Sequence, residues 1–318
     1  MTTFETYRAL LGSLDESQLK VSYSKKPFIL LCGGQAPERR HIHDEEPETQ
    51  SLRQAVNKQA LSELDINFHL FRPEEISEWA TDAIFKNLMD FERELAAVCS
   101  RVVIILESAG SIAELGAFSQ LLELNKKLIV IRNEYHGEEN SFIDLGILRY
   151  IKADHGQNKI KNYFWTPKSG KSRLVIDDQL VSDILHDLKE EIEGLKKSSK
   201  FKKIYDTHVS ALICEFTEIF TLIKETEIKV LLDSLNIHIS PDLLRRKLYI
   251  LKNFSLINEV TSGSYTYYYR TNEPFHTVNG FQNENGVIDK LRVAALIKEK
   301  IQEDRHRTRA LNKLGGVR

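Results

Sequence analysis

The chain has 318 residues, enough for two domains of ordinary size. Hydrophobic residues make up 42% of the sequence and charged residues 28%, which is typical of a soluble globular protein, and no apolar run approaches the ~18 residues of a membrane span. The net charge of −2 argues against a generic nucleic-acid binder. No basic stretch with an apolar core opens the chain, so we expect no signal peptide. Together with three scattered cysteines, Cys32, Cys99 and Cys214, this predicts a cytoplasmic protein.

Residues 28–152 alternate between short apolar runs and longer amphipathic segments. The runs FILLCGG (28–34), INFHLF (66–71), RVVIILES (101–108) and KLIVIRN (127–133) have the pattern of buried strands. Fully apolar strands that alternate with helices predict an α/β fold with a doubly wound parallel sheet and helices on both faces. Ligands of such sheets bind beyond the carboxyl ends of the strands. Gly33-Gly34 and Glu107-Ser108 fall at that edge, so we expect the two loops to meet.

A charged loop, QAPERRHIHDEEPE (35–48), follows the first of these strands. His41 and His43 beside Asp44 have the chemistry of metal ligands, but no further ligand is spaced to complete a site. We therefore predict a surface loop and no metal.

Past Gly156 the pattern changes to helices, with a basic interruption, KKSSKFKK (196–203), near which we place a domain boundary. The region from Lys290 to Arg318 holds nine Lys and Arg residues against three Asp and Glu, which suits a polyanionic partner. The predicted segments are an N-terminal helical extension (1–27), an α/β domain (28–165), a helical linker (166–205) and a C-terminal domain with a basic tail (206–318).

Residues 226–271 predict a helix, a turn, a basic helix and a hairpin, in that order. Ser240-Pro241 has the pattern of a helix start with proline at its first position, and Ser262-Gly263 marks the hairpin turn. The order resembles a winged helix-turn-helix, in which a helix enters a major groove and the hairpin touches the flanking backbone. The alternative is a winged helix used for protein contacts. The predicted nucleic-acid-binding residues are Arg245, Arg246, Lys247, Lys252, Tyr267 and Tyr269.

The stretch VVIILESAGSIAELGAF contains Glu107 and Glu114 on either side of a turn of small residues. A structural explanation is a capping box, in which the Ser111 hydroxyl accepts from the third backbone N–H and the Glu114 side chain reaches back. Three features favour a site instead, and the first is that the turn follows a buried strand at the ligand-binding edge of the sheet. Gly116 lies inside the helix, where glycine costs roughly 1 kcal/mol relative to alanine, so we expect something to approach closely. The turn at 108–111 could cradle a phosphate or ribose.

The segment ESAGSIAELGAFS (107–119) resembles the active-site segment of nucleoside 2-deoxyribosyltransferases, in which a strand ends in an acidic residue and a Glu-Leu-Gly helix follows. It is less similar to the motif of the cytokinin-activating phosphoribohydrolases. FILLCGG, VVIILESAGSIAELGAFS, KKLIVI and SFIDLGILRYI are similar, in the same order, to stretches of the effector proteins of type II-A retrons. That family joins a deoxyribosyltransferase-like domain to a winged helix.

The resemblance implies an anti-phage effector that binds a reverse transcriptase and its branched RNA–DNA product, msDNA, made from a non-coding RNA. It implies a toxin that hydrolyses NAD at the nicotinamide bond, with NAD as the substrate and no cofactor, and it leaves higher-order assembly open. By the same resemblance Glu114 is the nucleophile and Glu107 the second acidic residue. Many transferases have aspartate at that second position, and they carry a tyrosine where this chain has Cys32-Gly33-Gly34.

The chemistry is consistent with those residue types. A carboxylate beneath an anomeric carbon can stabilise an oxocarbenium-like state or form a glycosyl-enzyme, and the dipole of the first helical turn would keep Glu114 ionised. Glu107 could bind ribose hydroxyls or activate water. Asp90 and Glu94, on one face of the preceding helix, are expected to be solvated. The predicted substrate-binding residues are Cys32, Gly33, Gly34, Ser108, Gly110, Ser111 and Asp144. A glycosidase or deoxyribosyltransferase with another substrate, or a non-catalytic nucleotide sensor, remains the alternative.

Overall fold

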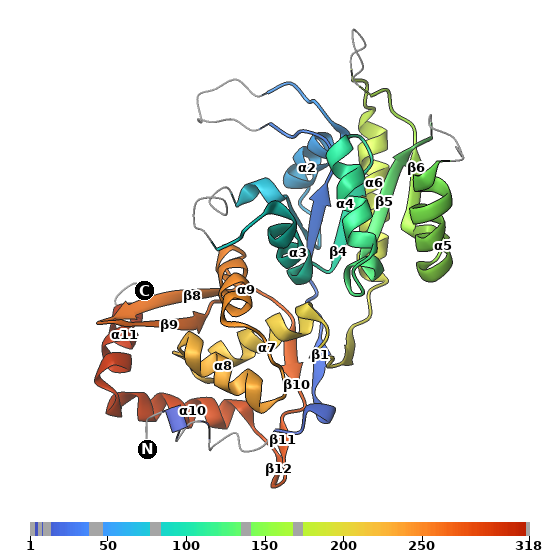
Figure 1. The fold of residues 1–318 in the computed structure, drawn as a ribbon. Coiled ribbons are helices and arrows are strands. Elements are labelled where there is room, and N and C mark those ends of the chain that lie inside the picture. The colour runs from blue at the N-terminus through green and yellow to red at the C-terminus, as the bar shows by residue number, and fades with distance from the viewer. Residues whose placement is uncertain are drawn as a thin grey trace. The chain divides into compact units, whose positions relative to one another are not determined.

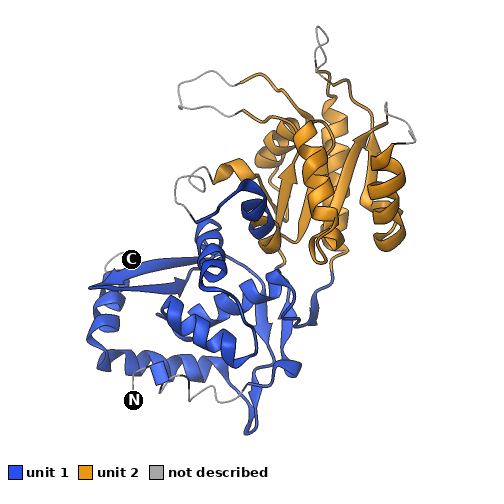
Figure 2. Cartoon of the chain, in the orientation of Figure 1, with its two compact units in different colours: residues 1–24, 78–94, 196–318 blue, residues 25–77, 95–195 orange. Residues whose placement is uncertain are grey.

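The structure is a computed structural model, which describes residues 4–5, 8, 14–37, 47–76, 84–134, 141–167 and 174–315 (Figure 1). The chain forms two compact units (Figure 2). One, the α/β unit, comprises residues 25–77 and 95–195. The other, the C-terminal unit, comprises residues 1–24, 78–94 and 196–318. In the ranges described, no helix combines the length and the apolar character needed to cross a membrane.

The α/β unit is built on a five-stranded sheet in the order β3-β2-β4-β5-β6, and every neighbouring pair is parallel. The strands are β2 (Phe28–Cys32), β3 (His69–Phe71), β4 (Arg101–Ile105), β5 (Leu128–Asn133) and β6 (Ile160–Tyr163). The residues of β2 and β5 are all buried, as the continuous apolar runs predict. The predicted doubly wound parallel sheet is confirmed. The strand order reverses between β2 and β4, which is the switch point where such sheets bind ligands.

The described helices of this unit that lie around the sheet (Figure 1) are α2 (Leu52–Ser62), α4 (Ala109–Ser119), α5 (Arg149–His155) and α6 (Asp178–Glu193). Helix α3 (Leu88–Val98) is divided between the units, with residues 88–94 in the C-terminal unit and 95–98 in the α/β unit. A π-helical segment (Ile143–Leu148) leads into α5. One face of the sheet packs against α2 and α6 in a core that contains Ile29, Val103 and Ile129. Although α6 falls in the predicted linker, its apolar face is part of this core. The compact units of the structure therefore differ from the four predicted segments. Residues 178–193, predicted as part of a linker, belong to the α/β unit because α6 packs against its sheet.

The C-terminal unit contains a three-stranded antiparallel sheet in the order β10-β1-β7. Its strands are β1 (Lys20–Ser22), β7 (Ser198–Lys200) and β10 (Thr277–Asn279). Its remaining elements are α7 (Asp206–Ile219), α8 (Glu225–Ser234), α9 (Pro241–Asn253), β8 (Ile257–Ser262), β9 (Tyr265–Arg270), β11 (Gln282–Asn283), β12 (Gly286–Val287), α10 (Lys290–Lys300) and α11 (Arg305–Gly315). Short 3-10 turns occur at Glu16–Gln18, Pro73–Glu75, Leu124–Lys126, Gln157–Lys159 and Ile301–Glu303.

The order helix, turn, basic helix and hairpin is confirmed by α8, α9, β8 and β9. The Ser240 hydroxyl caps α9 by accepting from the backbone N–H of Leu243 at 3.1 Å, and Pro241 is its first residue, as predicted. Gly263 has a φ of 63° in the turn between β8 and β9, where a residue with a Cβ would be strained. The basic region beyond Lys290 folds into α10 and α11.

Candidate nucleotide site

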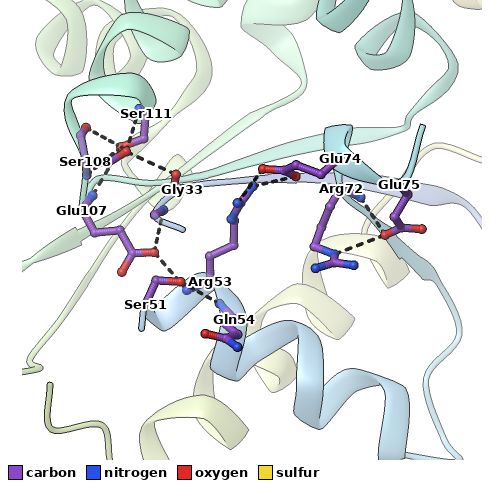
Figure 3. Close-up of polar contacts among 11 residues, drawn as sticks. Gly33, Ser51, Arg53, Gln54, Arg72, Glu74, Glu75, Glu107, Ser108 and Ser111 are labelled. Carbon is purple, nitrogen blue, oxygen red and sulfur yellow. Dashed lines mark hydrogen bonds and ion pairs between the residues drawn. The ribbon is translucent and has the colours of Figure 1, made fainter. Parts of the chain in front are cut away.

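The loops after β2 and β4 meet, as predicted. The backbone N–H of Gly34 donates to Glu107 Oε1 at 2.9 Å, and the Ser108 hydroxyl donates to the Gly33 carbonyl at 3.2 Å (Figure 3). A Cβ added to Gly34 would lie 2.8 Å from the Ser51 Cβ, closer than carbon atoms approach. The Gly33-Gly34 step is therefore needed to bring β2 this close to the start of α2 and to Glu107.

The Glu107 carboxylate sits on the N-terminus of α2. Besides Gly34, it accepts from the backbone N–H groups of Leu52 at 2.8 Å and Arg53 at 3.0 Å. Burial raises the pKa of Glu107, while these amides and the Arg53 charge act to lower it. The side chain thus bridges the end of β4 to the first turn of α2, where a helix favours an anion.

We expect Glu107→Ala to destabilise the protein by about 2–4 kcal/mol, because three backbone N–H groups would lose their acceptor. Glu107→Gln should cost less, since the amide oxygen still accepts. Urea denaturation measures both, with Glu193→Ala, an exposed position on α6, as the matched control. An unfolding midpoint for Glu107→Ala equal to that of the control would contradict this structural role.

Helix α4 begins three residues earlier than the predicted capping box. Its N-cap is Ser108, whose hydroxyl accepts from the backbone N–H of Ser111 at 3.1 Å, and the Ser111 hydroxyl accepts from the backbone N–H of Ser108 at 3.2 Å. The predicted box of Ser111 with Glu114 is wrong, because Ser111 already occupies the third helical position. Glu114 therefore lies in the second turn, beyond the part of the helix in which the dipole acts strongly.

Glu114 is half-buried, and within the described ranges its buried Oε2 atom has no hydrogen-bond partner. Burial raises the pKa of Glu114, and the positive charge of Arg53 and a hydrogen bond with Cys32 oppose that rise. A buried carboxylate oxygen without a partner is costly in a folded protein. It is the kind of exception that marks a functional group.

Arg53 is the charge that sequence reasoning missed. Arg53 is buried, and its guanidinium donates two hydrogen bonds to the Glu74 carboxylate, of 2.7 and 3.2 Å (Figure 3). Arginine is unusual in the first turn of a helix, where acidic residues are favoured. An arginine in the first turn of α2 was therefore the signal in the sequence that pointed to Arg53. The sequence does not reveal its partner Glu74, which lies 21 residues away.

A pocket of about 450 Å³ opens beyond the carboxyl ends of β4 and β5. Its polar lining comprises Glu107, Ser108, Arg132, Asn133, Ser141 and Asp144, and Ile112, Leu148 and Trp165 supply apolar surface. Asp144 pairs with Arg132 and accepts from the Ser141 hydroxyl at 2.7 Å. The structure therefore brings together three of the predicted site residues, Glu107, Ser108 and Asp144.

The other predicted residues do not line this pocket as the structure describes it. They are Cys32, Gly33, Gly34, Gly110, Ser111 and Glu114. Cys32 is fully buried, and Gly33 and Gly34 are covered by Glu107 and the start of α2. Among the described residues, no protein group makes the close approach expected at Gly116, because an added Cβ would meet no atom within 4 Å beyond the neighbouring residues and backbone of α4.

In the C-terminal unit, two predicted nucleic-acid contacts are contradicted by burial. The Lys247 side chain is 1% exposed and pairs with Glu94 at 3.0 Å and Asp206 at 2.6 Å. Tyr267 is fully buried, with Leu222 and Ala310 in a small core. Neither side chain can reach a ligand in this structure. Glu94, expected to be solvated, is 3% exposed because it neutralises Lys247.

The remaining four residues are partly accessible. Arg246 bonds Asp90 at 3.3 Å, Lys252 pairs with Glu259 at 2.7 Å, and Tyr269 is half-buried. Arg245, 57% exposed, pairs with Asp242 at 3.1 Å. The basic character of α9 is thus largely balanced by carboxylates of the same unit. His41, His43 and Asp44 lie outside the described residues.

The fold and site define an α/β protein in which Glu107 and Asp144 line a pocket beyond the carboxyl ends of the parallel strands β4 and β5, the edge where such sheets bind ligands. The chain also forms a helix-turn-helix with a hairpin. The sequence model of the family described as STM3845 retron effector protein matches residues 49–259. The chain belongs to this family of retron effectors.

Two curated relatives come from Escherichia coli. "Retron Ec73 putative ribosyltransferase/DNA-binding protein" is 32% identical over 155 residues, 47% of this chain and 46% of the relative. "Retron Ec86 putative ribosyltransferase/DNA-binding protein" is 28% identical over 160 residues, 50% of this chain and 48% of the relative. The chain spans about half the length of the curated relatives it matches.

Proposed function

We propose that this chain is the NAD glycohydrolase of an anti-phage retron, with Glu114 as the group that attacks the anomeric carbon. The observation that carries the proposal is the half-buried Glu114 carboxylate, which keeps one buried oxygen unbonded within the described part of the chain. Arg53 supplies a positive charge that favours the ionised, nucleophilic form of this carboxylate. The word ribosyltransferase in the names of both relatives supports glycosyl transfer.

The reaction proceeds in two displacements. A Glu114 oxygen bonds to the anomeric carbon as the bond to the pyridinium nitrogen breaks, and the nitrogen keeps the electron pair. Nicotinamide leaves as a neutral base, so this step needs no general acid. Water then attacks the same carbon, releases Glu114 and loses a proton to solvent, which yields ADP-ribose. The reaction uses no cofactor, because NAD is the substrate.

The pocket supplies groups suited to the rest of the nucleotide. Glu107 and Asp144 can accept hydrogen bonds from ribose hydroxyls, and the start of α4 at Ser108 presents backbone N–H groups to a diphosphate. Trp165 offers an aromatic face, and in the described structure its buried indole N–H has no partner. A volume of about 450 Å³ falls within the usual range for ligand pockets.

A second candidate function is a nucleotide sensor without turnover. It is favoured by one observation, that Glu114 is not among the residues that line the pocket. In that case nucleotide would bind beside Glu107 and Asp144, and Glu114 would have no chemical role. A glycosidase or deoxyribosyltransferase with another nucleoside or nucleotide would share the Glu114 chemistry and differ only in substrate.

We further propose that a reverse transcriptase and msDNA hold the effector in check or assemble it, and that the helix-turn-helix unit contacts them. The test is the release of nicotinamide from NAD by the full chain, alone and co-expressed with reverse transcriptase and msDNA. We expect release by the wild type and a change in its rate with the partners. If no preparation releases nicotinamide while NAD still binds, the sensor is correct. If neither occurs, a panel of nucleosides and nucleotides tests the alternative substrates.

A further inference from the structure

The basic side chains of α9 are poorly placed to bind a polyanion. Lys247 is buried between Glu94 and Asp206, and Arg246 bonds Asp90. Any phosphate that approached Arg246 would compete with a carboxylate that the chain itself provides. A nucleic-acid site in the C-terminal unit therefore requires a different set of cations.

Helix α11 provides such a set. Arg305, Arg309 and Lys313 are exposed, and their spacing of four residues places them along one ridge, about 6 Å apart along the helix axis. The helix contains no Asp or Glu. In the part of the chain that the structure describes, no ion pair is made by Arg305 or Arg309, and Lys313 donates to the neutral carbonyl of Thr261 at 2.7 Å. The ridge keeps its positive charge.

The ridge is held in place by a buried arginine of the same helix. Arg307, 1% exposed, bonds the Glu227 carboxylate of α8 and the Leu222 carbonyl, and its guanidinium lies 5.1 Å from the centre of the Tyr267 ring. These contacts dock α11 against the helix-turn-helix. The three exposed cations are therefore presented by a fixed element, which reduces the entropy lost when they bind.

The hairpin continues the surface of α11. Tyr265, 41% exposed, packs edge-on against His306 at 5.0 Å between ring centres. The Lys224 ammonium lies 4.1 Å from the centre of the Tyr265 ring, which adds a fourth cation beside an exposed aromatic side chain. We call Lys224, Tyr265, Arg305, Arg309 and Lys313 the α11–hairpin surface.

We propose that the α11–hairpin surface, rather than α9, binds the phosphate backbone of nucleic acid. The inference rests on the nucleic-acid contact in the proposed function and deepens it by naming the surface. Unpaired cations on a rigid ridge are the feature that phosphate recognition requires, and the Tyr265 ring offers a face for an exposed base. DNA and RNA share this phosphate chemistry.

The test compares two triple variants of the full chain. One is Arg305→Gln with Arg309→Gln and Lys313→Gln. The matched control removes three charges from α8 and α9: Lys229→Gln with Arg245→Gln and Lys252→Gln. Binding to labelled duplex DNA, single-stranded DNA and RNA of equal length is measured as a function of salt, and thermal unfolding of each variant verifies that it is folded.

The salt dependence of binding distinguishes the two surfaces. Each phosphate contact contributes about 0.9 to the slope of log affinity against log salt on duplex DNA and about 0.7 on a single strand. We expect the α11 variant to reduce the magnitude of this slope by about 2–3 with whichever nucleic acid binds. The control should leave the slope unchanged. An unchanged slope in the α11 variant, or an equal loss in the control, overturns the proposal. Failure of wild-type binding overturns the nucleic-acid contact itself, and nicotinamide release remains a separate readout.

Discussion

Glu114→Gln is expected to lower the rate of nicotinamide release from NAD by about 10³-fold or more, the scale seen when a covalent nucleophile is removed. Glutamine keeps the shape of the side chain, so NAD should still bind. Nicotinamide release and NAD binding are measured on the same preparations, with Glu193→Gln on the exposed face of α6 as the control. A variant that keeps more than about a tenth of the wild-type rate would remove Glu114 from the mechanism.

The same substitution should stabilise the protein, and the gain should depend on pH. Burial raises the pKa of Glu114, so the folded state favours the protonated carboxyl over the ionised one. The stability that this preference contributes is fully present below the unfolded pKa and is lost as the pH rises through the folded pKa. Glutamine carries no such penalty. The melting temperature of Glu114→Gln should therefore exceed that of the wild type at about pH 8 and match it at about pH 4. An equal difference at both pH values would show that the effect has another cause.

Lys247→Ala is expected to destabilise the protein by about 3–5 kcal/mol, because it removes the ammonium that bonds the buried Glu94 carboxylate at 3.0 Å and leaves Glu94 only the more distant Arg93 guanidinium at 3.8 Å. Burial alone would lower the pKa of Lys247, but Glu94 and Asp206 raise it above its ordinary value, so the ammonium stays charged. Urea denaturation measures the loss. The control is Arg245→Ala on the same helix, at a surface ion pair worth no more than about 1 kcal/mol.

A double variant separates the ion pair from simple packing. Lys247→Met with Glu94→Leu removes both charges and should recover most of the stability lost by Lys247→Ala. If the double variant is as unstable as the single one, the loss comes from packing and the removal of the Glu94–Lys247 ion pair is not its cause.

The central strands β2, β4 and β5 were predictable from sequence because they are buried and therefore read as continuous apolar runs, as in residues 28–32 and 128–131. The start of α4 was harder to place. Ser108 and Ser111 both have a polar residue three positions later, so two capping boxes compete. The Ser108 box forms in the structure, where the Ser108 hydroxyl also bonds the Gly33 carbonyl across the sheet edge.

The contacts that sequence reasoning missed join residues that are distant in the chain. The sequence analysis did not single out Arg53, because its importance depends on the tertiary contacts that place Glu74 and Glu114 near it. Similarly, the α9 sequence carries the pattern of a basic recognition helix, and only the tertiary structure sets Glu94 against Lys247. The number of charged residues in a segment does not distinguish a side chain that is available to a ligand from one that pairs with a carboxylate of the same protein.

The sheet β10-β1-β7 has a consequence for how the chain matures. Strand β1 is the central strand, and Val21 pairs with Ser199 on one side and Val278 on the other. During synthesis β1 emerges long before either neighbour exists, and contacts of such long sequence separation form slowly. The whole α/β unit, by contrast, falls within residues 25–195, and of that range only residues 78–94 belong to the C-terminal unit. We therefore expect the α/β unit to fold first on the ribosome-bound chain. Strand β1 should complete its pairing only after residues 277–279 have been synthesised.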